Sequence, residues 1–580
     1  MKRLALIVLL LAGTLAVAND SKIAPELRGY PPTQQANIIV QYAPGTQVNC
    51  SGLLGLVDCL VNDILDLGGT ILAPLPLVNG LVAQLDGNGI VSLSNQANVI
   101  YISPDRILAP NLSNAAPAIN AFAAWQSGYT GEGVGVALID SGVSSHPDLK
   151  GGFLGGSRVV WNQSFIPGNS STNDQYGHGT HVAGLIAGDG ASSTGPQYSR
   201  TFEGIAPGAT LLNLRVLDQN GEGTDSEVIA AISEAIALKP LFNIRVINLS
   251  LGREVYETYK LDPLCQAVEA AWKSGIVVVV SAGNNGRTQA SDGYGTITSP
   301  GNDPYVITVG AMKPMGTPTR TDDLIASYSS KGPTAGDAIV KPDVVAPGNL
   351  LVSLEAPNST LYNEFPTDQV PYSYYVNGGS SASSSSYFTL SGTSMAAGVV
   401  SGAVADLLQK TPSLTPDQVK ARLMKTAWKS LPSYSSYTDP VSGITYTDQY
   451  DVFTVGAGYV DLEAALANTD LANGTAMSPT ATFNASNNSV YLTDSPSAVW
   501  NTSATWSNAA VWGTSQFLVG SGAISASQTA SPTVSGNNAL WGGNALWGGN
   551  ALWGGNALWG GNALWGGNAL WGGSVPTGEN

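Results

Sequence analysis

The chain contains three histidines, and their positions limit the catalysis that it could perform. They are His146, His178 and His181, so no histidine follows residue 181. No His-Glu-x-x-His pair occurs, which excludes a zinc protease of that type. A Ser-Asp-His order would require a histidine after its serine, and therefore a nucleophile early in the chain. The order Asp, His, Ser stays open, and it would serve nucleophilic catalysis by an activated hydroxyl group.

Three segments could supply these groups. Asp140 ends the apolar run 136–139, and His178 lies between two glycines where we expect a helix to begin. Ser394 comes just before the small-residue stretch 396–408, which we expect to be a helix. In an open parallel sheet, ligands bind where the carboxyl ends of strands meet helix N-termini. The three side chains are therefore predicted to converge on one cleft.

Five near-continuous apolar runs indicate the strands that must position these groups. Such runs are typical of the parallel sheet of an α/β protein, with helices on both faces. They cover residues 134–139, 211–217, 246–251, 276–281 and 306–312. A helix is expected over 226–237. Another is expected to begin at Thr415, because Thr415 and Gln418 have the spacing of a capping box.

In this order the three segments resemble the signature of the subtilisin-like serine peptidases, or subtilases. The segments are Asp140-Ser141-Gly142, Gly177-His178-Gly179-Thr180-His181 and Ser391-Gly392-Thr393-Ser394-Met395-Ala396. The resemblance covers roughly residues 113–470 and implies a subtilisin-like parallel sheet with helices on both faces. It implies that Ser394 is the nucleophile, that His178 is the general base and then acid, and that Asp140 orients the imidazole.

The resemblance also implies the rest of a peptidase site. Asn284, in a segment that follows an apolar run, would donate its amide to the oxyanion of the intermediate. Residues of two segments would bind the substrate backbone, namely Ser250, Leu251, Gly252, Ala282 and Gly283. An extended peptide could pair with the edge at 250–252, which favours peptides as substrates. His146 and His181 are interpreted as structural residues.

Several features depart from the family pattern. The family's Pro and His after the nucleophile are replaced by Gly398 and Val399, which removes no catalytic group. The loop 185–203 lacks the Asn-rich pattern of a known subtilisin calcium site, so no metal ligand is assigned. Calcium stays open through the resemblance alone, as the only cofactor considered. A Ser-rich surface insertion is expected between Gly348 and Ser394, while 341–348 is expected to support the cleft.

Composition excludes other classes of protein. The 580 residues include 24 Lys and Arg against 41 Asp and Glu, a net charge of −17, which argues against a nucleic-acid partner. With 43% hydrophobic residues the chain can bury a sizeable core. Three cysteines exclude a disulfide-built scaffold. Cys50 and Cys59 could form a short disulfide, and Cys265 is expected to be a buried thiol.

The first residues indicate export. Lys2 and Arg3 precede the apolar run 4–11, and small residues lead to Ala18, so 1–18 is predicted to be a signal peptide. The alternative, a membrane anchor, needs about 20 apolar residues, more than this run provides. The protein is therefore expected to be secreted, with cell-surface association open.

Residues 19–112 are predicted to be a small α+β unit. Apolar runs at 38–42, 81–85 and 99–102 indicate strands, and the stretch 53–67 is amphipathic. The subtilase resemblance implies that this unit is an inhibitory prodomain, removed by self-cleavage between roughly 103 and 115. A permanent accessory domain is the alternative.

The region after residue 470 differs in composition. Residues 471–537 are predicted to be a Ser/Thr/Ala/Gly-rich linker, in which Trp500, Trp506 and Trp512 mark degenerate hexads. Six Asn-Ala-Leu-Trp-Gly-Gly repeats fill 538–573, and 574–580 end the chain as given. A flexible, sticky tail is the favoured interpretation. A β-structured module that binds the cell surface or wall is the alternative, because regularly spaced exposed Trp marks an interaction surface.

These observations predict a secreted serine endopeptidase made as a self-processed precursor. Its partners would be protein or peptide substrates and its own prodomain as an intramolecular inhibitor. The alternative is a surface adhesion or wall-binding protein whose peptidase-like domain is inactive.

Overall fold

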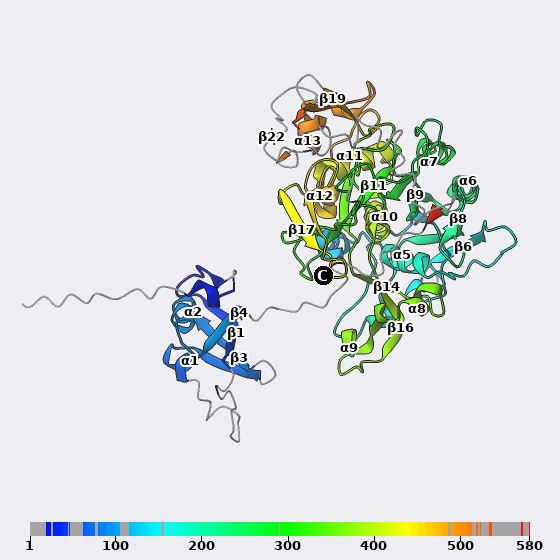
Figure 1. The fold of residues 1–580 in the computed structure, drawn as a ribbon. Helices are drawn as coiled ribbons and strands as arrows, with labels where there is room; N and C mark the ends of the chain where they lie inside the picture. Colours follow the sequence, from blue (N-terminus) through cyan, green and yellow to red (C-terminus); the bar gives the residue numbers. More distant parts are fainter. Residues whose placement is uncertain are drawn as a thin grey trace, which may run out of the picture. The chain divides into compact units, whose positions relative to one another are not determined.

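In the computed structural model, the chain forms two compact units, Met1–Ala109 and Pro110–Asn580 (Figure 1). The structure describes residues from 19 onward except for the following ranges: 25–26, 44–45, 47–61, 76–78, 105–114, 152–155, 289–290, 485–488, 513–517, 520–521, 524–532, 536–569, 572–578 and 580. Each unit has its own hydrophobic core.

The first unit is an antiparallel sheet with two helices. The strands follow the order β2-β3-β1-β4. They are β1 (Gln35–Tyr42), β2 (Thr70–Leu75), β3 (Gly80–Asp86) and β4 (Val99–Pro104), with helices α1 (Asn62–Asp66) and α2 (Gly87–Ser94). The three predicted runs lie in β1, β3 and β4. The sequence missed β2, and the expected stretch 53–67 lies outside the described residues except for its end, which contains α1.

The second unit is built on an eight-stranded sheet. Its order is β12-β11-β10-β9-β5-β7-β6, and β13 also pairs with β11. The pairs are parallel except for β12 with β11. The strands are β5 (Gly135–Asp140), β6 (Val159–Ser164), β7 (Thr210–Arg215), β9 (Ile244–Leu249), β10 (Val277–Ser281), β11 (Ile307–Lys313), β12 (Leu324–Ile325) and β13 (Val344–Pro347). All five predicted runs are confirmed as strands of this sheet.

Helices cover the sheet and complete an α/β architecture (Figure 1). Helices α5 and α10 pack on each other and against the sheet, whereas α6 and α7 pack together beside β9 and β10. The helices are α3 (Ala115–Ala118), α4 (Ala121–Gln126), α5 (His178–Ala187), α6 (Asp225–Phe242), α7 (Pro263–Lys273), α10 (Thr393–Lys410), α11 (Pro416–Thr426) and α12 (Leu462–Ala467). The predicted capping box is confirmed: Thr415 N–H donates to Gln418 Oε1 at 3.1 Å, and Gln418 N–H donates to Thr415 Oγ1 at 3.2 Å.

The stretch between Gly348 and Ser394 forms a three-stranded sheet of its own. Its antiparallel order is β14-β16-β15. The elements are β14 (Leu351–Leu354), α8 (Thr360–Glu364), β15 (Gln369–Pro371), α9 (Tyr372–Tyr375) and β16 (Ser383–Leu390). Strand β14 packs against α5, so this insertion supports the helix that begins at His178.

Residues after 470 are partly folded onto the second unit, which differs from the predicted linker. Trp500, Trp506 and Trp512 are at most 4% exposed and belong to its main core. Trp500 Nε1 donates to the carbonyl of Met477 at 2.8 Å, and Lys425 of α11 lies over the Trp506 ring. Each Trp offers a large apolar area, and burying it outweighs the linker-like composition.

Two short strands precede residue 470, β17 (Tyr434–Thr438) and β18 (Thr445–Gln449). The short elements after residue 470 are β19 (Thr480–Asn484), β20 (Ser489–Thr493), α13 (Asn508–Trp512), β21 (Leu518–Val519), β22 (Gly522–Ala523), β23 (Thr533–Ser535) and β24 (Leu570–Trp571). Most of the six perfect repeats, together with the predicted Cys50–Cys59 pair and the proposed cleavage region, lie outside the described residues. Cys265 is a buried free thiol, as predicted. Among the residues that the structure describes, no helix has the length and apolar character needed to cross a bilayer.

Candidate active site

Asp140 and His178 are in direct contact. Asp140 is the last residue of β5 and His178 is the first residue of α5. His178 Nδ1 lies 2.8 Å from Asp140 Oδ1, and both side chains are at most 1% exposed. A carboxylate only accepts hydrogen bonds, so Nδ1 carries the proton and Nε2 is left as the basic atom of a neutral ring. Strand β5 is central in the sheet, which makes this position rigid.

Asp174 organises the turn that presents His178. Its Oδ1 accepts from Gly177 N–H at 2.7 Å and from the Ser141 hydroxyl at 2.8 Å, and its Oδ2 accepts from Thr180 N–H at 2.8 Å. Ser141 Oγ in turn accepts from Gly179 N–H at 2.9 Å. The segments of Asp140 and His178 are thus joined through one buried carboxyl group. Burial raises the pKa of Asp174, and these hydrogen bonds oppose that shift.

The charges around His178 decide its protonation. Burial by itself lowers the pKa of His178, but the charge and hydrogen bond of Asp140 and the charge of Asp174 outweigh it. The net pKa of His178 is raised above its ordinary value of 6.5. A raised pKa makes the imidazole a stronger base, as a group that must accept a hydroxyl proton requires.

Ser394 lies within the first turn of α10, which begins at Thr393, three residues before the expected helix start at residue 396. Helices α10 and α5 pack closely one turn further on. A Cβ at Gly398 would lie 3.2 Å from Val182 Cγ1, so the glycine at this position permits the close approach. Gly398 follows Ser394 by one helical turn and Val182 follows His178 by one turn. The starts of the two helices are thereby held near each other.

Ser394 also makes a reciprocal contact with Ser250. The Ser394 hydroxyl donates to the Ser250 carbonyl at 3.1 Å, and the Ser250 hydroxyl donates to the Ser394 carbonyl at 2.9 Å. His178 Nε2 is buried without a hydrogen-bond partner among the described residues. If the Ser394 hydroxyl rotated away from the Ser250 carbonyl, its proton would be available to a different acceptor. Catalytic hydrogen bonds often form fully only when substrate is bound.

Asn284 is oriented by the residue that precedes Ser394. Its side-chain oxygen accepts from Thr393 N–H at 2.9 Å and from the Thr393 hydroxyl at 3.0 Å. Gly283 N–H donates to the same hydroxyl at 3.1 Å. Because these contacts hold the oxygen of the amide, its donor group, Nδ2, is the end directed away from Thr393. Asn284 can therefore offer N–H groups at a site next to Ser394.

The other expected substrate-binding residues flank this site in two segments. Ser250, Leu251 and Gly252 follow β9, and Ala282 and Gly283 follow β10, its neighbour in the sheet. The Ala282 N–H donates to Val309 O at 3.0 Å, and its carbonyl accepts from Thr298 N–H at 3.1 Å. Because both backbone groups of Ala282 are bonded within the protein, Ala282 would contribute to substrate binding through its small side chain and not through its N–H group.

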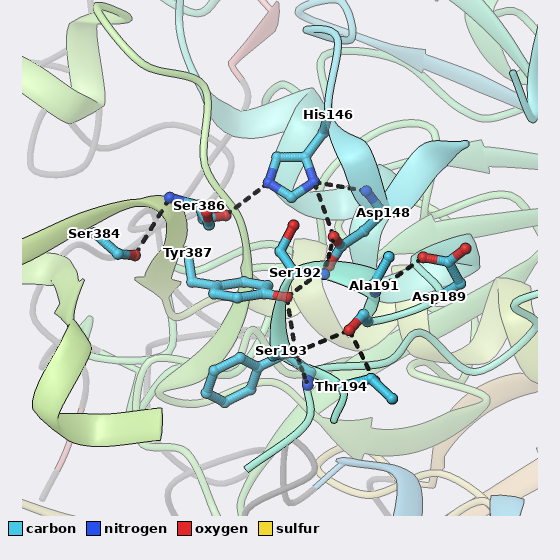
Figure 2. Close-up of polar contacts among 12 residues, drawn as sticks. His146, Asp148, Asp189, Ala191, Ser192, Ser193, Thr194, Ser384, Ser386 and Tyr387 are labelled. Atoms are coloured by element: carbon cyan, nitrogen blue, oxygen red, sulfur yellow. Dashed lines mark hydrogen bonds and ion pairs between the residues drawn. The ribbon is translucent and has the colours of Figure 1, made fainter. Parts of the chain in front are cut away.

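His146 has a structural environment. It accepts from Asp148 N–H at Nδ1 over 3.1 Å, and its Nε2 donates to the Ser386 carbonyl at 3.0 Å. Figure 2 shows this ring above Tyr387 of the insertion, whose hydroxyl donates to Asp148 Oδ2 at 2.6 Å. Burial lowers the pKa of His146, in keeping with a neutral ring.

His181 lies three residues after His178 on α5 and binds the backbone of the insertion between Gly348 and Ser394. Its Nε2 donates to the carbonyls of Leu351 and Phe388 at 3.0 and 3.2 Å. Burial lowers the pKa of His181 to about 3. The segment 341–348, expected to support the cleft, contacts the residues just before Ser394. The Gly348 carbonyl accepts from Gly392 N–H at 2.7 Å.

The side chains around His178 do not have the composition of a calcium site. Within the described part of the chain, no group of three or more His, Cys, Asp or Glu side chains could hold a metal ion. The His178 ring has one carboxylate neighbour, Asp140 at Nδ1, and no hydrogen-bond partner at Nε2 among the described residues. Calcium is instead coordinated by six to eight oxygens.

Much of this chain is similar to known proteins. A family model described as the subtilase family matches residues 131–474, which is more than half of the chain. The chain belongs to the subtilase family. It is accordingly a serine-type endopeptidase.

Three relatives illustrate the extent of the similarity to this subtilase. It is 39% identical over 354 residues to serine protease AprX of Bacillus subtilis (strain 168), covering 60% of this chain and 73% of the relative. It is 35% identical over 367 residues to subtilisin E of the same organism, covering 62% and 78%. It is 34% identical over 350 residues to subtilisin DY of Bacillus licheniformis, covering 60% and 96%.

Two residues of this subtilase site escaped sequence reasoning, Asp174 and Thr393. Asp174 precedes the start of α5 by four residues, and an acidic residue shortly before a helix is a signal for capping. Thr393 lies inside the recognised segment, but its contact with Asn284 joins positions more than a hundred residues apart. No local pattern could have indicated that contact.

Proposed function

We propose that this subtilase is a secreted endopeptidase that hydrolyses peptide bonds through Asp140, His178 and Ser394. The observation that carries the proposal is the buried contact between His178 Nδ1 and Asp140 Oδ1 at 2.8 Å, with Ser394 on the helix that packs against α5. This contact leaves Nε2 as the only basic ring atom, which is the atom that a general base needs.

The reaction would proceed by acyl transfer. His178 Nε2 removes the proton of the Ser394 hydroxyl while Oγ forms a bond to the carbonyl carbon of the substrate. Asn284 Nδ2 and the Ser394 N–H donate hydrogen bonds to the oxyanion that develops. The protonated His178 then gives its proton to the amine as the C–N bond breaks. Water, activated by the same imidazole, hydrolyses the acyl-enzyme and restores the Ser394 hydroxyl.

The peptide substrate would lie along residues 250–252 as an added strand, with Ala282 and Gly283 forming part of the pocket wall. Backbone pairing of this kind recognises any extended peptide, and side-chain pockets add preference. A protein or peptide is therefore the proposed substrate class.

The proposal includes synthesis as a precursor. Residues 1–18 would direct export, and the α+β unit that follows would inhibit the enzyme until self-cleavage between roughly 103 and 115. The compact sheet of β1 to β4, separate from the second unit in its core, supports an independently folded prodomain. Calcium belongs to this proposal only as a general family property, with no ligand assigned.

A second candidate is a surface or wall-binding protein with an inactive peptidase-like domain. The repeats at 538–573 motivate it, and the intact set of Asp140, His178, Ser394 and Asn284 argues against it. Deletion of 538–573 tests the surface role without removing the buried Trp500, Trp506 and Trp512. Unchanged partition between cells and medium would remove the anchoring idea.

The decisive experiment is labelling of the purified secreted protein by a serine-directed phosphonofluoridate. We expect one label on Ser394 and loss of peptidase activity, with Ser394→Ala as the unlabelled control. The Ser394→Ala protein should also keep its unprocessed size. Absence of label on the wild-type protein would contradict the proposed mechanism.

A further inference from the structure

The carboxylate of Glu579, which follows the repeats, is buried in the second unit. The residue is 1% exposed. Its Oε1 accepts from Ser327 N–H at 2.9 Å, from the Ser327 hydroxyl, and from Arg287 Nη2 at 3.0 Å. Lys313 Nζ lies 3.8 Å from Oε2. A carboxylate is buried only when cations and hydrogen-bond donors compensate its lost hydration, and this pocket supplies both.

The pocket also recognises the main chain of Glu579. Its N–H donates to Asn349 Oδ1 at 2.9 Å, and its carbonyl accepts from Asn349 Nδ2 at 2.7 Å. The side chain and both backbone groups of one residue are therefore bound at once. Such two-fold recognition is what a peptide-binding site for an acidic residue requires.

The walls of the pocket are held in place by other contacts. Arg287 Nε donates to the Ser327 hydroxyl at 2.9 Å. The ring of Tyr437, from β17, lies 5.0 Å from the Arg287 guanidinium and 5.1 Å from Lys313 Nζ. Cations held over an aromatic ring lose less entropy when a carboxylate binds.

A second contact involves the last repeat. Strand β24 (Leu570–Trp571) pairs antiparallel with β8 (Glu222–Gly223), with Leu570 opposite Gly223 (Figure 1). Gly221, the residue before β8, approaches Tyr176 so closely that a Cβ there would meet the Tyr176 ring, and the centroid of this ring lies 6.4 Å from that of His178. A strand edge takes one partner at a time, so β24 excludes another peptide from this edge.

The two contacts lie on segments that also form the candidate active site. Arg287 follows Asn284 by three residues. Asn349 follows Gly348, whose carbonyl holds Gly392, two residues before Ser394. At the other contact, Gly221 precedes β8 and approaches Tyr176, which lies two residues before His178.

We propose that the chain's own segment at 570–571 and Glu579 is an intramolecular ligand of the peptidase unit, anchored by Glu579 in the pocket of Arg287, Lys313, Ser327 and Asn349. By pairing with β8, next to the Tyr176 ring whose centroid lies 6.4 Å from that of His178, this ligand competes with substrate for the approach to His178. Residues 572–578 join the two anchors outside the described residues, and the proposal does not depend on their conformation. The competition rests on the proposed function, whereas the binding of Glu579 does not.

Hydrogen exchange tests the binding without any activity. In full-length Ser394→Ala protein, Glu579→Gln should accelerate amide exchange of the peptides that contain Ser327 and β8 by about tenfold, while Glu364→Gln at an exposed position of α8 should change neither. Deletion of 570–580 should reproduce the result and guards against a local defect of the Gln variant. Acceleration at Ser327 alone, or at neither place, would overturn the proposal.

Kinetics test the competition. In the active enzyme, Glu579→Gln should lower KM for a peptide substrate about tenfold at unchanged kcat, because a larger fraction of the enzyme is open to substrate. An unchanged KM in an active enzyme would overturn competition. Complete inactivity of every variant together with altered exchange would instead count against the proposed function alone.

Discussion

The Asn284 side-chain oxygen accepts two hydrogen bonds from Thr393, at 2.9 Å from its N–H and at 3.0 Å from its hydroxyl. The residue before the proposed nucleophile thus sets the direction in which the proposed oxyanion donor points. These two hydrogen bonds fix the position of the proposed donor relative to the proposed nucleophile.

Replacing Thr393 by Val should reduce kcat roughly tenfold with little change in KM. The variant keeps the shape and the N–H contact but loses the hydroxyl that orients Asn284 and Gly283. Asn284→Ala should cost about 10²–10³ in kcat, as removal of an oxyanion donor does. Because Thr393 acts through Asn284, the double variant should be no slower than Asn284→Ala alone, and fully additive losses would contradict this role.

Replacing Asp140 by Asn should reduce kcat by about 10⁴ while the protein stays folded. An amide at this position can donate to Nδ1, which would move the ring proton to Nε2 and remove the base. Steady-state kinetics and circular dichroism check the two parts of this prediction. Activity within tenfold of the wild type would show that Asp140 does not hold the tautomer.

Asp174→Asn should move the acidic limb of the kcat/KM profile to lower pH. His178 acts as a base only when neutral, so activity falls as pH drops through its raised pKa. Loss of the Asp174 charge removes one cause of that rise. The control is Asp189→Asn, at a carboxylate bound to Arg158, which should leave the limb in place. A shift in the control, or none in Asp174→Asn, would contradict the assignment.

His181 should make the folded state less stable in acid. Its pKa is about 3 in the folded protein against an ordinary 6.5, so the unfolded state binds the extra proton between these values. Stability is complete above pH 6.5 and falls by about 1.4 kcal/mol per pH unit below it.

His181→Gln provides the matching measurement, because Gln can still donate to the carbonyls of Leu351 and Phe388. Urea unfolding at pH 7.5 and pH 5 should show a loss for the wild type about 2 kcal/mol larger than for the variant. Comparison of the two proteins cancels the other titrating groups. Equal losses would mean that His181 is protonated in the folded state.

The parallel sheet could be predicted because its signal is local. The five strands that were predicted in the second unit are near-continuous apolar runs, and the start of α11 carries its capping residues within four positions. Strand β2 was missed because it contains Pro74, which weakens a strand signal and is tolerated here on an edge strand. The sequence also predicted that Asp140 ends a strand and that His178 begins a helix, as the structure has them.

The remaining features depend on contacts between distant segments. Asp174 joins Ser141 to Thr180, and Thr393 joins Gly283 and Asn284 to α10, through hydrogen bonds that no spacing encodes. The pocket of Glu579 combines Arg287, Ser327 and Asn349 with a residue from beyond the repeats. Such tertiary contacts decide the geometry of a site whose residue types are evident from the sequence.

The burial of Trp500, Trp506 and Trp512 limits how many C-terminal residues the enzyme can lose without losing its fold. A protease fragment that ended before Trp500 would have three indole-sized holes in its interior and would unfold or be digested. Long-lived fragments of the enzyme should therefore retain residue 512, however much of the repeat array they have lost.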